Sequence, residues 1–190
     1  MDAIFYYVYG FLHCSAYRET FANDLKKMLP RLPLVDDVRE FWAFSNAGRK
    51  LAELHVGYEA LPPYEGVTVT GAEKGFFTVE KMRFPAKDRK DTILYNSQIK
   101  IENIPAKAYE YIVNGKSAIE WIMERYAITT HKESGIVNNP NDWADEVGNP
   151  RYILDLLLSV INLSIQTVDI VAGLPAITFE TEKVDEPAFV

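Results

Sequence analysis

The sequence predicts an α+β fold, in which helices at both chain ends enclose a short antiparallel sheet in a single domain. Apolar residues recur at helical spacing near both ends of the chain, whereas residues 67–102 are rich in β-branched and aromatic residues separated by turn formers. The 190 residues are 48% apolar and 25% charged, a globular composition, and no Gly/Ser- or Pro-rich linker divides them. We therefore expect one domain over residues 1–175, followed by a flexible acidic tail over residues 176–190.

Three helices are expected in the N-terminal part. The first two cover residues 2–13 and 15–29, and the second ends before Pro30. The third begins at Asp37, which with Glu40 forms a carboxylate version of the capping box, and it continues to about Tyr58. Its apolar residues recur at helical spacing and should face the core: Val38, Phe41, Trp42, Leu51, Leu54 and Tyr58.

Strands are expected at residues 67–70, 76–84 and 92–102, and the last two would form a hairpin around residues 85–91. Helical spacing returns at residue 106 and breaks at Asn114-Gly115. Ser117 and Glu120 then supply a capping box for a helix that ends near residue 126. Residues 129–148 are expected to form a long irregular loop, and the last helix covers residues 149–173.

Composition limits the environment in which the protein can act. The single Cys14 cannot form an internal disulfide, which favours a reducing cytoplasm. The apolar stretch at residues 152–165 is interrupted by Asp155 and Asn162 and is shorter than the ~20 residues that cross a bilayer, so no membrane partner is expected. A formal net charge of −7 argues against nonspecific DNA wrapping over the whole surface, but it leaves room for a local basic face.

The sequence carries no arrangement of residues typical of a catalytic or metal site. It lacks a phosphate-binding loop, and His13, His55 and His131 do not stand at metal-ligand spacing with other ligand residues. Residues 61–64 (LPPY) resemble the base-clamping motif of adenine methyltransferases, but Leu61 cannot accept a hydrogen bond from an adenine amine. We therefore expect no catalytic residue, metal or cofactor in this chain.

The strongest charge asymmetry lies in residues 80–105. Six cations there, offset by Asp88 and Asp91, leave a net charge of +4 over residues 81–100. Such a local excess in an acidic chain indicates a phosphate-contacting surface, and a hairpin could carry it into a groove. The alternative is a charged edge that is merely solvated and resists aggregation. The candidate cations are Lys81, Arg83, Lys87, Arg89, Lys90 and Lys100.

Alternation along a strand would place Lys81 and Arg83 on one face, opposite Met82 and Phe84. The partner strand would add three further DNA-contact candidates, Tyr95, Asn96 and Gln98. Amide side chains suit paired hydrogen bonds with adenine in the major groove. Residues 134–143 (SGIVNNPNDW) are rich in side chains that stabilise turns, and base contact by their asparagines is a second, weaker interpretation.

Several long strings resemble the C-terminal target-recognition (specificity) domain of single-chain type ISP restriction-modification enzymes, also described as DEAD/DEAH helicase-like. The resemblance extends from about residue 4 to residue 175 and is weakest at residues 66–100, as expected where specificity varies. The strings are residues 6–34 (YYVYGFLHCSAYRETFANDLKKMLPRLPL), 41–59 (FWAFSNAGRKLAELHVGYE), 108–126 (AYEYIVNGKSAIEWIMERY), 134–143 and 150–171 (PRYILDLLLSVINLSIQTVDIV).

The resemblance implies a non-catalytic module that recognises a short asymmetric sequence in double-stranded DNA and presents the target adenine to a methyltransferase. A parent polypeptide would carry the nuclease, the ATP-driven translocase and the methyltransferase upstream, and would bind ATP, Mg²⁺ and S-adenosylmethionine there. An alternative function is a docking module that holds those neighbouring domains through exposed aromatic residues, without reading bases. A free-standing enzyme is the third hypothesis, and no constellation in the sequence favours it.

Overall fold

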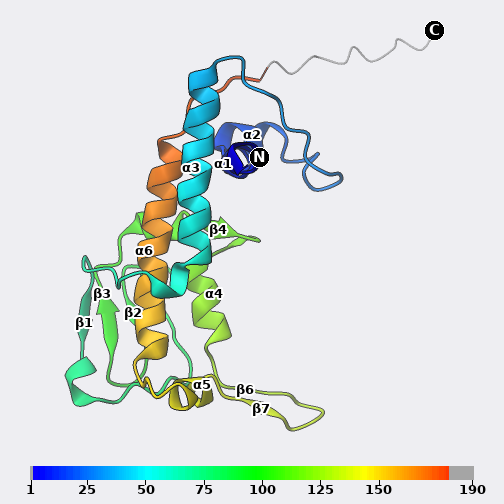
Figure 1. Cartoon of the computed structure of the whole chain (residues 1–190). Helices are drawn as coiled ribbons and strands as arrows, with labels where there is room; N and C mark the ends of the chain where they lie inside the picture. Colours follow the sequence, from blue (N-terminus) through cyan, green and yellow to red (C-terminus); the bar gives the residue numbers. More distant parts are fainter. Residues whose placement is uncertain (1, 180–190) are drawn as a thin grey trace. The chain divides into compact units, whose positions relative to one another are not determined.

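The computed structural model describes residues 2–179 (Figure 1). Its α-helices are α1 (Asp2–Phe11), α2 (Ser15–Thr20), α3 (Val38–Val56), α4 (Ala118–Arg125), α5 (Asn141–Glu146) and α6 (Tyr152–Ala172). Short 3-10 helices lie at η1 (Tyr58–Ala60), η2 (Ala72–Lys74) and η3 (Ala106–Tyr109). The strands are β1 (Thr68–Thr70), β2 (Ile93–Leu94), β3 (Lys100–Glu102), β4 (Ile112–Val113), β5 (Lys116–Ser117), β6 (Thr129–Thr130) and β7 (Val137–Asn138). The α+β class, with helices at both chain ends and small antiparallel sheets, is confirmed.

The described residues separate into two compact units, and the boundary falls inside α3 and inside α6. Of the described residues, unit 1 contains residues 2–53 and 170–179, and unit 2 contains residues 54–169. Each unit has its own cluster of buried apolar side chains.

Aromatic residues form the core of unit 1. Tyr7, Phe11, Tyr17 and Phe44 are buried together, and rings at successive turns of α1 and α3 contact one another edge-on or tilted. The Tyr7 hydroxyl donates a hydrogen bond to the carbonyl of Pro33 (2.8 Å), and the Tyr17 hydroxyl donates to that of Arg31 (3.0 Å). These bonds hold the extended segment that follows α2 against the aromatic core.

A glycine contact lets α1 and α3 approach closely. A Cβ atom added at Gly48 would lie 1.9 Å from the carbonyl oxygen of Tyr6, and one added at Gly10 would lie 2.3 Å from that of Phe44. Neither position can accept a side chain unless a helix moves, because both neighbours are backbone atoms.

Unit 2 is built around α6 and a three-stranded antiparallel sheet with the strand order β1-β3-β2. Val69, Ile101 and Ile93 oppose one another across the three strands, and the two isoleucines are fully buried against α6 and its neighbours. Among the described residues, α6 has the length and apolar composition to cross a membrane, yet 61% of its most apolar window is buried within the protein. A buried core helix passes the same test of length and composition.

The capping box of α4 is confirmed. Ser117 Oγ accepts a hydrogen bond from the Glu120 N–H (3.2 Å), and the Glu120 carboxylate accepts one from the Ser117 N–H (3.2 Å). Just before it, β4 and β5 form a tight hairpin across Asn114 and Gly115, both of which have positive φ. Asn-Gly favours this turn. The expected helix from residue 106 is therefore wrong beyond η3, because the chain turns into this hairpin.

Three other expectations for local structure are corrected. The second helix ends at Thr20 rather than near residue 29, and the chain continues as hydrogen-bonded turns, such as Leu25 N–H to Phe21 carbonyl (2.9 Å). The expected strand at residues 92–102 is two strands, β2 and β3, joined by a turn. The expected irregular loop at residues 129–148 contains the β6–β7 hairpin and α5.

The expected strand at residues 76–84 forms no ladder in the described part of the chain. It contributes one bridge, between Arg83 and Leu94. Of the expected tail, residues 180–190 lie outside the described residues, while Ile177 and Phe179 pack against the aromatic core of unit 1.

Candidate functional site

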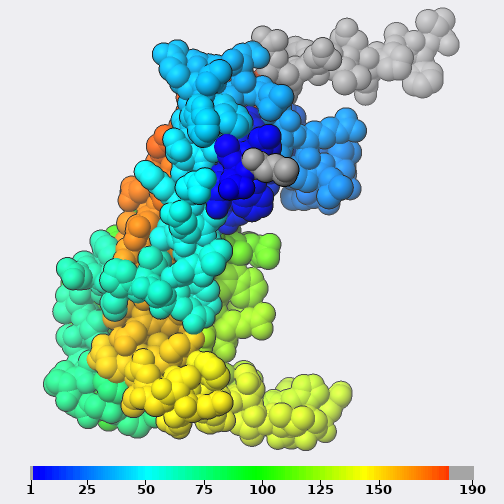
Figure 2. All heavy atoms as spheres, viewed as in Figure 1, coloured from blue at the N-terminus to red at the C-terminus, as the bar shows by residue number. Residues whose placement is uncertain are grey.

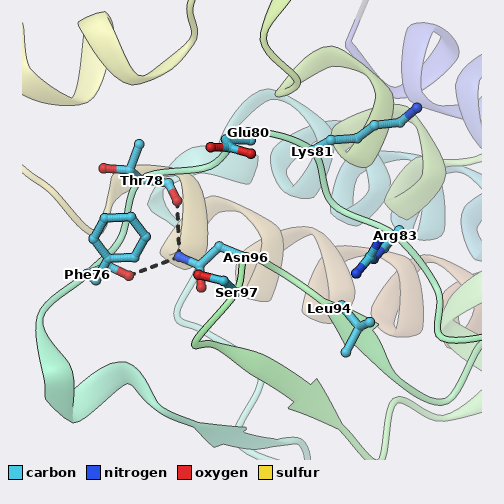
Figure 3. Close-up of a pocket in the computed structure, with 8 residues that line it drawn as sticks. All are labelled: Phe76, Thr78, Glu80, Lys81, Arg83, Leu94, Asn96 and Ser97. Carbon is cyan, nitrogen blue, oxygen red and sulfur yellow. Dashed lines mark hydrogen bonds between the residues drawn. The ribbon is translucent and has the colours of Figure 1, made fainter.

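Two asparagine side chains, in place of a β-ladder, hold residues 76–83, which we call the clamped segment. The Asn96 amide donates to the carbonyls of Phe76 (2.9 Å) and Thr78 (3.0 Å), as Figure 3 shows. Its Oδ1 atom accepts hydrogen bonds from the N–H groups of Gln98 (2.9 Å) and Ile99 (2.7 Å). The Asn96 side chain thus joins the clamped segment to the turn between β2 and β3. Its polar atoms are engaged in the fold, so the structure does not support Asn96 as a reader of adenine.

Asn141, the first residue of α5, holds the middle of the same segment. Its Oδ1 atom accepts from the Val79 N–H, and its Nδ2 atom donates to the Val79 carbonyl, both at 2.8 Å. This pair of bonds reproduces what a neighbouring strand would offer, and the side chain is buried. Asn141 is therefore a positioning residue, and base contact by it is not supported.

The clamped segment directs its polar side chains outward. Val79 and Met82 are buried, whereas Thr78, Lys81 and Arg83 are exposed. Met82 and Phe84 pack in or against the core, and Lys81 and Arg83 are exposed as expected, although Lys81 also lines a depression with Met82 and Phe84. Alternation shifts at the neighbours Glu80 and Lys81, which are both exposed.

A row of paired residues crosses the outer face of the sheet. Thr70 opposes Lys100, Lys100 opposes Leu94, and Leu94 opposes Arg83. Two backbone hydrogen bonds of 2.8 and 3.1 Å fix the last pair. Directly opposed residues project to the same face of a sheet, so Arg83 and Lys100 flank Leu94 on the outer side. With ~4.8 Å between strands, their backbones lie about 10 Å apart.

Next to this row lies an open hollow of about 510 Å³ (Figure 3). It combines cationic, acidic, hydroxyl and aromatic groups, and Lys81 stands at its rim because it also lines a depression beside α4. Among the described residues, Lys81, Arg83 and Lys100 make no ion pair. The residues that line the hollow are Phe76, Thr78, Glu80, Lys81, Arg83, Leu94, Asn96 and Ser97.

The other predicted cations are not part of this hollow. Lys90 pairs with Glu120 (2.8 Å), and its ammonium lies 5.7 Å from the centre of the Phe84 ring and 5.6 Å from that of Tyr109. Burial raises the pKa of the Glu120 carboxyl, but the hydrogen bonds from Lys90 and Ser117 outweigh it and leave that pKa below its usual value. The charge of Lys90 is thus largely compensated.

Arg89 lies 3.9 Å from Asp91, and Lys87 is exposed on the same loop. The single cationic projection expected from the sequence is therefore divided. Lys81, Arg83 and Lys100 gather at the hollow and the outer sheet face, while the loop of residues 85–91 carries partly compensated charge.

Two predicted contact residues of the β2–β3 turn differ in exposure. Tyr95 is fully buried, and its hydroxyl donates to the carbonyl of Phe77 (3.0 Å). Burial raises the pKa of this phenol far above its ordinary value. Tyr95 therefore belongs to the core and cannot contact DNA in this structure. Gln98 is exposed on the turn beside the row.

Sequence reasoning missed a projecting hairpin. Residues 128–138, which we call the arm, contain β6 and β7, and every residue of the arm is exposed. Figures 1 and 2 show it standing clear of the rest of unit 2, in yellow-green. The Ile128 N–H donates to the Glu80 carbonyl (2.8 Å), so the base of the arm adjoins the clamped segment. The β-branched residues on both sides of Gly135 were the signal for a hairpin.

Residues 2–179 contain no cluster of metal-ligating side chains. No group of three or more His, Cys, Asp or Glu side chains lies close enough to hold a metal ion there. Cys14 is buried in the aromatic core of unit 1.

Comparisons with known proteins identify the family. The sequence profile of the type ISP C-terminal specificity domain matches residues 1–156. A search of curated protein sequences finds no match. The chain resembles the solved structure of a nuclease-deletion mutant of the type ISP restriction-modification enzyme LlaGI in complex with a DNA substrate mimic, with a TM-score of 0.86 and 48% identity over 95% of this chain.

Two further structures are similar. The ATP-dependent type ISP enzyme LlaBIII bound to DNA gives a TM-score of 0.83 and 43% identity over 92% of this chain, and a DrdV–DNA complex gives 0.75 and 31% over 94%. This chain covers 17% of the LlaGI chain, 11% of the LlaBIII chain and 18% of the DrdV chain. On the match of its sequence and its fold, the chain belongs to the family of type ISP C-terminal specificity domains.

Proposed function

We propose that this chain binds double-stranded DNA through the hollow and the outer face of the β1-β3-β2 sheet, and that it selects the site at which a restriction-modification enzyme acts. The observation that carries the proposal is the gathering of Lys81, Arg83 and Lys100, without ion pairs to described residues, on one side of unit 2 in a chain of formal net charge −7. The DNA complexes of LlaGI, LlaBIII and DrdV support it.

The shape of the hollow suits the sugar–phosphate backbone. The backbone is the convex ridge of a duplex, and it carries the charge that unpaired cations neutralise with release of counterions. Arg83 offers a planar fork of donors that matches a phosphate, and Lys81 and Lys100 add point charges on either side. Thr78 and Ser97 supply hydroxyl donors of the kind that fix register on phosphates.

Methylation and cleavage are assigned in this proposal to other parts of a longer polypeptide. That polypeptide would carry a nuclease, a translocase that uses ATP and Mg²⁺, and an adenine methyltransferase that uses S-adenosylmethionine, and it would act in the cytoplasm. The chain spans less than a fifth of the type ISP enzymes it matches, which fits a module that selects the site while others react.

Equilibrium binding of the full chain to a labelled duplex, repeated over a range of salt concentrations, tests the proposal. Each phosphate contact contributes about 0.9 to the slope of log affinity against log salt. We expect Arg83→Ala, Lys81→Ala and Lys100→Ala each to lower that slope by about 1. Lys50→Ala, at an exposed position in unit 1, is the matched control because it removes the same charge. Slopes equal to that of Lys50→Ala for all three variants would contradict the proposal.

Exposed apolar residues of unit 1 favour a second function, docking to neighbouring domains. Ile4 and Phe5 on α1 are each 62% exposed, and Val38 and Trp42 on α3 are also exposed. Exposed aromatic and aliphatic side chains suit a protein interface. Purified methyltransferase and translocase segments should bind the full chain and lose that binding on Phe5→Ser. Retained binding would exclude docking through these residues.

A further inference from the structure

We infer that the arm, residues 128–138, enters the major groove of bound DNA and contacts base edges there. This inference rests on the proposed function, because it assumes that unit 2 holds a duplex. It assigns base readout to a hairpin distinct from the hollow, and it names the groove and the side chains involved.

The arm is exposed along its whole length. Ile136 is 68% exposed and Val137 58%, so neither face of the hairpin packs against the core. A two-stranded hairpin without a buried face gains little stability, and its open edges favour unwanted strand pairing. A protein that retains such an element needs another use for it, and a binding partner supplies one.

Hydrogen bonds order the tip of the arm and anchor its base. His131 Nδ1 lies 3.0 Å from Ser134 Oγ, and Ser134 Oγ accepts from the Ile136 N–H (3.4 Å). The His131 N–H donates to the Ile136 carbonyl (2.9 Å). At the other end, the Asn139 Oδ1 atom accepts from the amide of Asn141, which clamps Val79. The arm is therefore shaped before it meets a partner, which lowers the entropy cost of binding.

The dimensions of the arm suit the major groove of DNA. The major groove of B-DNA is about 12 Å wide and admits a two-stranded β-ribbon without deformation, whereas the minor groove is only about 6 Å wide. Strands rise about 3.3 Å per residue, so the five residues from the base to the tip span roughly 17 Å. A ribbon of that length can lie along the groove, so that residues at its base as well as at its tip come near the base edges.

The base of the arm lies next to the hollow. The bond between the Ile128 N–H and the Glu80 carbonyl sets the arm next to the hollow, which receives the sugar–phosphate backbone in our proposal. Each groove is bounded by backbones, so an element rising beside a backbone site faces a groove directly. The chain as a whole is acidic, but the arm carries one Lys and one Glu, which leaves it without net repulsion from phosphates.

The side chains of the arm can form hydrogen bonds with base edges. Thr129 opposes Asn138, so their side chains share one face of the ribbon. Asparagine matches the donor and acceptor that adenine presents in the major groove, and the threonine hydroxyl beside it can donate or accept a hydrogen bond. This set favours an A·T pair over a protein partner, whose interface would bury larger aromatic anchors.

The test begins with selection of preferred sites from a randomised duplex library by the full chain. Binding to the selected duplex and to a scrambled duplex is then compared for the wild type, Asn138→Ala and Thr129→Ala. Ile112→Ala, on the exposed β4–β5 hairpin, serves as the control variant. We expect each arm variant to reduce the ratio of the two affinities about tenfold, and the control to leave it unchanged.

A base analogue makes the test specific for the groove. Replacing the contacted adenine by 7-deazaadenine removes an acceptor in the major groove and should weaken the wild type about tenfold, with no further loss for Asn138→Ala. Unchanged ratios for both arm variants, or equal loss on both duplexes, overturn the inference. If Arg83→Ala still lowers the salt slope, the proposed function stands without it. Failure of the wild type to select any sequence overturns both.

Discussion

Two hairpins of unit 2, β2–β3 and the arm, use the same antiparallel pairing but bury very different surfaces. On β2–β3, Ile93 and Ile101 lie in the core, and the outer face carries Leu94 and Lys100. The arm buries neither of its faces. The difference separates two tasks: one hairpin stabilises the unit and presents cations on its outer side, while the other adds a projection that is free to meet a partner.

The largest expected effect is on the buried hairpin. Ile101→Ala removes a fully buried side chain from the central strand and leaves a cavity between the sheet and α6. We expect a loss of about 2–5 kcal/mol in the free energy of unfolding. Chemical denaturation of the full chain measures it. A loss below 1 kcal/mol, roughly that of an ordinary surface change, would show that the sheet packs less closely than described.

The second largest loss of stability is expected when the clamp on residues 76–83 is removed. Asn141→Ala leaves the N–H and the carbonyl of the buried Val79 without their partners, and we expect destabilisation of about 1–3 kcal/mol. DNA affinity should fall as well, because the clamped segment positions Arg83. Asn46→Ala, at an exposed position on α3, is the control for removal of an amide. Equal stability of the two variants would refute the clamp.

A smaller effect is expected at the start of α4. Ser117→Ala removes the side chain that caps the helix and should cost about 1 kcal/mol. Ser97→Ala, in an exposed turn, tests whether loss of any hydroxyl has this effect. Thermal unfolding followed by circular dichroism compares them. An unchanged midpoint for Ser117→Ala would show that the Glu120 half of the box suffices.

The smallest expected change in stability lies on the arm. Ile136→Ala makes the same chemical change as Ile101→Ala, but at a side chain that touches no core, so the free energy of unfolding should change by less than about 0.5 kcal/mol. A loss as large as that of Ile101→Ala would mean that the arm packs against the unit, and it would remove the contrast between the two hairpins.

Long elements with strong end signals could be predicted from the sequence. The last helix has apolar residues throughout and a proline near its start, and Ser117 with Glu120 marked the beginning of α4 three residues apart. Local rules suffice in such places, because the capping partners are neighbours in the chain. The alternation of Lys81, Met82 and Arg83 is equally local, and it predicts correctly that Met82 is buried between two exposed cations.

Features that depend on distant partners could not be predicted. Nothing near Val79 shows that Asn141, 62 residues later, takes the place of a neighbouring strand. The sequence predicts surface positions for Asn96 and Tyr95, because it does not reveal that their partners are the backbone carbonyls of residues 76–78. It predicts a free cation at Lys90, because Glu120 lies 30 residues away. Asn114-Gly115 fits both a helix break and a hairpin turn, and the structure has the hairpin.

Hydrogen–deuterium exchange of the full chain, with and without a duplex that carries its selected sequence, tests the central claim directly. If unit 2 holds DNA with the hollow and the arm, bound duplex should slow exchange at residues 128–138 and 78–83 and leave α1 in unit 1 unchanged. Slowed exchange confined to unit 1, with the arm exchanging as fast as in the free protein, would contradict it.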